Sequence, residues 1–85
     1  METKLRKILQ LVGGPAATVI VAREDWRFVA TLIAPCFEGM HEIERQEVVW
    51  EALLDQLSDT EAEFLEFVFT EAPSEIVAAS APAAR

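Results

Sequence analysis

The most constraining feature of the sequence is a change of apolar period at Phe37-Glu38-Gly39. Before it, residues 27–34 (RFVATLIA) are apolar or β-branched almost throughout and are followed by Pro35, which is typical of a strand with a sharp end. After it, from Met40 to Leu57, apolar residues recur at the spacing of a helix. Gly39 provides the backbone freedom that a tight corner needs. The sequence therefore predicts a strand, a corner and a long amphipathic helix.

The long helix is predicted to have two distinct faces. One face is apolar and is expected to be buried; it consists of Ile43, Val49, Trp50, Leu53, Leu54 and Leu57. The neighbouring face is acidic and consists of Glu44, Glu47, Glu51 and Asp55. We expect this helix to cover one side of a sheet and to present its acids to solvent or to a partner.

The stretch before the corner predicts a helix followed by a hairpin. Residues 4–12 carry an apolar stripe at helical spacing, and Gly13-Gly14-Pro15 ends it. Residues 18–22 (TVIVA) form a strand, and only Arg23-Glu24-Asp25 separates them from Trp26 and the next strand, so the two strands pair antiparallel.

The stretch after the long helix predicts a short helix and a third strand. Ser58 and Glu61 have capping-box spacing. In residues 64–70 (FLEFVFT), alternation places Leu65, Phe67 and Phe69 together on one face, and Pro73 ends the strand. We expect residues 1–76 to form a single domain and residues 77–85 to be a flexible Ala-rich tail.

The order of these elements is α-β-β-α-α-β. A helical crossover separates the second and third strands, which favours a parallel pair. We therefore predict the α/β (α+β) class, with a small mixed three-stranded sheet and helices on one face. Because Ile20, Val29 and Ile33 alternate away from the other apolar strand residues, the uncovered face is also expected to be apolar. This face predicts contact with a partner protein or with a second copy of the chain.

The charge is distributed unevenly along the chain. Residues 1–37 carry five bases and three acids, whereas residues 38–75 carry twelve acids and one base, Arg45; the net charge is −8. Binding to nucleic acid depends on clustered Lys and Arg, and anionic membranes repel acids, so both partners are disfavoured. The acids either keep a small domain soluble or form a docking face for a basic protein.

Catalysis and metal binding find little support in the sequence. His41 is the only histidine and Cys36 the only cysteine. We expect a solvated histidine at the start of the long helix and a small buried cysteine, with a reactive thiol as the alternative for Cys36. The helix carboxylates lack the looped oxygen cage that calcium prefers and the apolar pocket that acid–base catalysis needs. We predict no enzyme activity, no bound metal and no cofactor. A single cysteine and the absence of a signal-peptide pattern indicate a cytoplasmic protein.

The corner and its surroundings resemble the BolA family. Phe37, Gly39 and Arg45 are similar to that family's F-x-G and R-H-R signature, and the A-P-S-E-I stretch around Pro73 also has a BolA counterpart. The similarity runs from about Leu5 to Ile76. It implies a fold similar to class II KH domains, with these four residues in structural roles. It also implies partnership with a monothiol glutaredoxin in holding a [2Fe-2S] cluster or, for some members, DNA binding.

The sequence departs from the family at the residues that carry chemistry. The R-H-R motif is Arg45-Gln46-Glu47 here. The stretches that resemble the ligand-bearing ones, Arg23–Trp26 and Glu61–Phe64, contain neither histidine nor cysteine, the donors that iron–sulfur clusters require. We therefore predict a protein-interaction or adaptor module without catalysis. The first alternative is an adaptor to glutaredoxin, and the second, disfavoured by charge, is a DNA-binding regulator.

Overall fold

A computed structural model describes residues 1–80 of the chain, and the side chains of residues 1–76. The elements follow the order α1 (Glu2–Gly13), β1 (Thr18–Glu24), β2 (Arg27–Ile33), the 3-10 turn η1 (Pro35–Phe37), α2 (Glu42–Gln56), α3 (Asp59–Glu63), β3 (Leu65–Glu71) and α4 (Pro73–Ser80). The predicted fold class is confirmed. Helix α4 was not predicted. The expected tail 77–85 begins inside α4, and its residues 81–85 lie outside the described residues.

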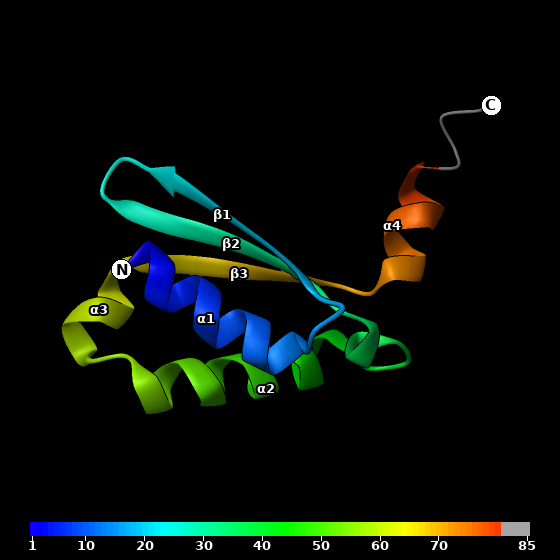
Figure 1. Cartoon of the computed structure of the whole chain (residues 1–85), viewed down its shortest axis with the longest axis horizontal. Helices are drawn as coiled ribbons and strands as arrows, with labels where there is room; N and C mark the ends of the chain where they lie inside the picture. Colours follow the sequence, from blue (N-terminus) through cyan, green and yellow to red (C-terminus); the bar gives the residue numbers. More distant parts are fainter. Residues whose placement is uncertain (81–85) are drawn as a thin grey trace.

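The sheet has the predicted mixed topology, with strand order β1-β2-β3. Strands β1 and β2 pair antiparallel around a turn at Asp25-Trp26, where Asp25 has a φ of 57°. A first turn residue with positive φ matches the right-handed twist of the flanking strands. Strands β2 and β3 pair in parallel. Helices α1 and α2 lie on one side of the sheet, and α4 rises from the end of β3 on the other side (Figure 1).

The core lies between the sheet and α1 and α2. Its fully buried side chains come from every layer, and the largest are Phe37, Leu5, Leu9, Leu32, Leu53, Val49 and Val68. The strand-to-helix corner is formed by η1, whose Phe37 is buried, and by Gly39, whose φ is 77°. A residue with a Cβ is strained at such a φ, which explains the glycine.

The prediction for the faces of α2 is partly wrong. Val49 and Leu53 are fully buried, but Ile43 is 74% exposed and Leu54 is 62% exposed. The buried side of α2 instead includes Arg45. Helix α2 packs against α1 and β3, and the side that carries Arg45, Val49 and Leu53 is the buried one. Leu54 and Ile43 therefore lie on a side that no other element covers.

The prediction for the faces of β3 is also wrong. Val68 and Thr70 are buried, whereas Phe67 and Phe69 are 40% and 50% exposed. A register irregularity between Phe28 and Val29 leaves one additional residue on β3, because Leu65 pairs with Phe28 and Phe67 pairs with Val29. An additional residue reverses the alternation of side chains beyond it. Leu65 therefore faces the core and the two phenylalanines face away from it.

Candidate functional site

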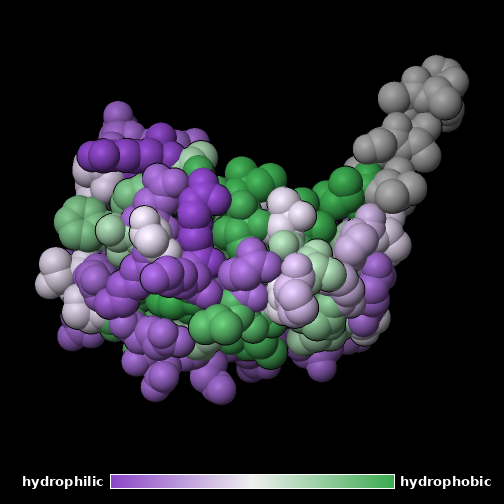
Figure 2. Space-filling model, in the orientation of Figure 1, coloured by the Kyte–Doolittle hydropathy of each residue, from purple (hydrophilic) through white to green (hydrophobic). Residues whose placement is uncertain are grey.

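The face of the sheet opposite α1 and α2 carries an apolar patch. The register places Ile20, Thr31 and Phe69 in one row across the three strands, and Val29 beside Phe67 in the next. The rings of Phe67 and Phe69 meet edge to face, with their centroids 4.9 Å apart. We call Ile20, Val29, Ile33, Phe67 and Phe69 the open-face patch. Figure 2 shows hydrophobic side chains gathered on this side of the sheet, next to α4.

The structure adds Phe67 and Phe69 to the three patch residues predicted from the sequence. Ile20 is 50% exposed, while Val29 and Ile33 are half-buried. Simple alternation puts both phenylalanines on the same face of β3 as Leu65, which is buried. The additional residue between Leu65 and Phe67 moves them to the opposite face. No local signal in the sequence marks that irregularity. The patch is consequently larger and more aromatic than predicted.

The outer edge of β3 is not available for strand pairing in this region. The side-chain amide of Gln46 donates to the carbonyl of Val68 at 2.9 Å, and Arg45 donates to the carbonyl of Thr70 at 3.4 Å. Glu42 also accepts the hydroxyl proton of Thr70 at 2.8 Å. Side chains that occupy edge carbonyls prevent another strand from adding there. A partner that contacts β3 therefore meets the patch and not this part of the edge.

The predicted acidic residues all lie on the exposed surface of α2. Glu44, Glu47, Glu51 and Asp55 are exposed. The salt bridges between described side chains join Lys4 to Glu61, Arg6 to Glu2 and Arg45 to Glu75, so these four acids take part in none of them. In the described part of the chain, no salt bridge neutralises the negative charge of this acidic face.

The four residues singled out by the family resemblance converge at the corner that holds α4. Arg45 is 5% exposed, and it donates to both carboxylate oxygens of Glu75, at 2.8 and 2.7 Å, and to the carbonyl of Met40 at 3.0 Å. Its guanidinium lies 5.7 Å from the ring centroid of Phe37. Pro73 is the first residue of α4, and Gly39 turns the chain beneath this contact. The structural role that the resemblance implies for these four residues stays a prediction.

The start of α4 has a capping signal that sequence reasoning missed. Glu75 accepts a hydrogen bond from the backbone N–H of Ala72 at 2.9 Å, and Glu38 accepts from the N–H and hydroxyl of Ser74 at 3.2 and 2.7 Å. Proline at the first position of a helix and glutamate at the third are both typical of a helix start. Pro73 thus ends β3 and also begins α4.

The contact with Arg45 strongly affects the acidity of Glu75. The hydrogen bonds from Arg45, followed by that from the Ala72 N–H, lower the pKa of Glu75 from 4.5 to about 2. The same contact raises the pKa of Arg45 above its ordinary value. In the capping box of α3, the N–H of Ser58 and then the ammonium of Lys4 lower the pKa of Glu61. These groups stabilise the fold, and none of them lies in a cavity suited to acid–base catalysis.

Several solved structures share this arrangement of elements. A bolA protein homologue from Coxiella burnetii matches with a TM-score of 0.68 and 23% identity, covering 91% of this chain and 96% of its own. BolA1 from Arabidopsis thaliana matches with a TM-score of 0.67 and 25% identity, covering 86% and 92%. A bol-like protein from Babesia bovis matches with a TM-score of 0.61 and 19% identity, covering 92% and 91%. This chain has the BolA-like fold. No protein-family model and no curated protein matches it.

The BolA resemblance associates metal ligands with two stretches, and the structure brings those stretches together. The rings of Trp26, at the hairpin tip, and Phe64, beside β3, meet edge to face with centroids 5.9 Å apart. The N–H of Phe28 donates to the carbonyl of Phe64 at 2.7 Å, and the guanidinium of Arg27 lies 4.6 Å from the Trp26 ring centroid. A contact between aromatic rings offers no thiolate or imidazole donor, so these residues do not fit an iron–sulfur cluster.

The single histidine and the single cysteine of this BolA-like chain lie elsewhere. His41 is the N-cap of α2, and Cys36 lies in η1 with its sulfur 3.8 Å from the carbonyl of Val12. Cys36 is exposed, so the expectation of a buried cysteine is wrong. Among the described residues, no group of three or more His, Cys, Asp or Glu side chains is placed to hold a metal ion. Within the same part of the chain, no helix is long and apolar enough to cross a membrane.

Proposed function

We propose that this BolA-like protein is a non-catalytic interaction module of the cytoplasm, and that a different protein with an apolar surface binds its open-face patch. The observation that carries the proposal is the exposure of three large apolar side chains on one face of the sheet, with Ile20 of β1 at 50% and Phe67 and Phe69 of β3 at 40% and 50%. Contiguous apolar surface of this kind in a soluble domain is typical of an interaction site. Aromatic anchors such as Phe67 and Phe69 are enriched at the centres of interfaces.

The charge of the chain favours a different protein over a second copy. Each copy carries a net charge of −8, so two copies repel each other at low ionic strength. A partner of lower or opposite charge avoids this repulsion while covering the same apolar surface. The acidic face of α2 would then add long-range attraction to a basic partner.

The test compares the wild type with two variants in affinity capture from the native host. The Phe67→Thr/Phe69→Thr variant removes the aromatic anchors but keeps side chains that suit a strand. Leu11→Gln is the matched control, because Leu11 is 77% exposed on α1, away from the patch. We expect a protein captured by the wild type and the control to be lost from the double variant. Equal capture by all three proteins would contradict the role of the patch.

Light scattering over a range of concentrations tests whether a second copy of the chain binds the open-face patch. We expect the wild type to remain monomeric. A dimer that forms as the concentration rises, and that the Phe67→Thr/Phe69→Thr variant does not form, would assign the patch to a second copy of the chain instead of a different protein.

A second candidate function is that of an adaptor to a monothiol glutaredoxin in iron–sulfur handling. The observation that favours it is the exposed pair Trp26 and Phe64, 54% and 38% exposed, at the place where the BolA resemblance expects a shared cluster. In this role the glutaredoxin supplies the metal ligands and this chain supplies the contact surface. Adding the protein to a cluster-loaded monothiol glutaredoxin tests it by visible circular dichroism. An unchanged spectrum at saturating protein would exclude this function.

A further inference from the structure

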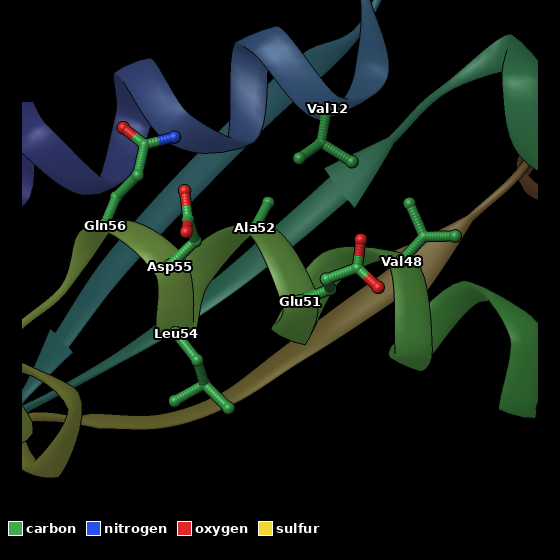
Figure 3. Close-up of a pocket in the computed structure, with 7 residues that line it drawn as sticks. All are labelled: Val12, Val48, Glu51, Ala52, Leu54, Asp55 and Gln56. Carbon is green, nitrogen blue, oxygen red and sulfur yellow. The ribbon is translucent and has the colours of Figure 1, made fainter.

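A second surface, on the opposite side of the molecule from the open-face patch, is a groove along α2. One depression lies between α2 and the end of α1, where Val12 points toward Val48 and Ala52 (Figure 3). An adjoining depression extends toward the start of α2 and is lined by Met40 and Trp50. The two depressions share Val48, Glu51 and Leu54, so they adjoin along the exposed side of α2, and we call them together the α2 groove.

The α2 groove exposes apolar side chains that the core leaves out. Val48 is 46% exposed and Leu54 is 62% exposed, and Ile43, on the same helix, is 74% exposed. Positions 43, 47, 50 and 54 share one side of a helix, and positions 44, 48, 51 and 55 share the side next to it. The first stripe is therefore mainly apolar, with Ile43, Trp50 and Leu54 beside Glu47, and the second is mainly acidic, with Glu44, Glu51 and Asp55 beside Val48.

All the charged side chains that line the α2 groove are acidic. They are Glu44, Glu47, Glu51 and Asp55. The described salt bridges involve none of them. Of the three bases on the neighbouring helix α1, Lys4 pairs with Glu61 and Arg6 with Glu2, and Lys7 lines neither depression. An occupant therefore needs an apolar side and positive charges beside it, which excludes nucleic acid and anionic lipid as matching surfaces.

We infer that the α2 groove binds a basic amphipathic helix of another protein. The groove extends from Met40 to Gln56, which corresponds to about 25 Å of helix at 1.5 Å per residue. A helix of roughly 15 residues fills that length, with apolar anchors one or two turns apart and Lys or Arg on both flanks. This inference goes beyond the proposed function, because it concerns a different face and stands if the open-face patch has no partner.

The test uses a synthetic, end-blocked helical peptide of about 15 residues, with leucines at helical spacing and lysines on the flanks, titrated into the full chain by calorimetry. The Glu51→Gln/Asp55→Gln variant removes two groove charges, and Val48→Ser removes an apolar contact. The control is Glu24→Gln/Glu66→Gln, which changes the net charge equally at exposed sheet positions. Circular dichroism melts verify that every variant is folded.

We expect both groove variants to weaken binding about tenfold and the control to change it less than about threefold. Amide chemical-shift changes are expected along α2, and the Phe67→Thr/Phe69→Thr variant is expected to bind as the wild type does. Equal weakening by the control, equal binding of a peptide with the same residues in a scrambled order, or shifts centred on the sheet would each overturn the inference. The first two results would indicate nonspecific charge attraction, and the third would indicate binding at the open-face patch.

Discussion

The guanidinium of Arg45 binds both carboxylate oxygens of Glu75, at 2.8 and 2.7 Å, across 30 residues of sequence. Arg45 comes from α2 and Glu75 from α4, so this contact, together with the hydrogen bonds from Ser74 to Glu38, joins the last described helix to the body of the domain. Arg45 is almost completely buried, whereas the side chain of Glu75 is 43% exposed. The pair therefore helps to set the position of α4, and with it one border of the open-face patch.

The Arg45→Ala variant is predicted to be markedly less stable than the wild type. The substitution leaves the carbonyls of Met40 and Thr70 without the donor they have now and opens space beside Phe37. We expect a loss of about 2–4 kcal/mol in the free energy of unfolding, measured by urea denaturation. Arg6→Ala, which removes an exposed pair with Glu2, is the control and is expected to change stability by less than about 1 kcal/mol. Similar losses in the two variants would contradict the structural role of Arg45.

Stability is predicted to fall in acid because of Glu75. Its pKa is about 2 in the folded chain and 4.5 ordinarily, so its contribution is complete above about pH 4.5 and disappears as the pH falls toward 2. The lowered pKa of Glu61 acts in the same direction. We expect Glu75→Gln to melt below the wild type near neutral pH, with the difference shrinking in acid. A difference that stays constant from about pH 6 to pH 2.5 would show that the charge of Glu75 is not responsible.

The two adjacent glycines at the end of α1 are predicted to resist substitution for different reasons. A Cβ on Gly13 would lie 2.6 Å from the Cβ of Ala17, whereas a Cβ on Gly14 meets nothing within 4 Å but sits at a φ of 89°. We expect Gly13→Ala to lose about 1–3 kcal/mol through overpacking, and Gly14→Ala to lose roughly 1–2 kcal/mol through backbone strain. Adding Ala17→Gly should rescue part of the first loss and none of the second, as a double-mutant cycle in urea would measure. Equal rescue of both would contradict the steric explanation.

The orientation of β3 predicts which of two neighbouring side chains contributes more to stability. Val68 is fully buried and Phe69 is 50% exposed. We expect Val68→Ala to lose about 2 kcal/mol and Phe69→Ala no more than about 1 kcal/mol in the free energy of unfolding. A larger loss for Phe69→Ala would place the phenylalanines in the core and would remove the basis of the open-face patch.

The sequence by itself determined the class of the fold and most of its elements. Strand and helix periods, Pro35 and Gly39 at the corner, and the capping box at Ser58 are local signals, and each of these elements formed. The hairpin and the parallel crossover followed from the lengths of the connections, and the BolA resemblance from short motifs near the corner. These features depend on residues within a few positions of each other or on the length of a connection, and both can be read directly from the sequence.

Only the tertiary structure decided which side chains face outward. An additional residue opposite Phe28 turned Phe67 and Phe69 out of the core, and the contacts of α1 and β3 with α2 left Leu54 exposed. The hydrogen bonds from Arg45 to Glu75 attached α4 at the end of the sheet. Each of these outcomes depends on residues far apart in the chain. Helical or strand periodicity shows which residues of one element share a face, but not which face packs against the rest of the domain. The surfaces available to partners were therefore set by packing between elements, which the sequence pattern does not contain.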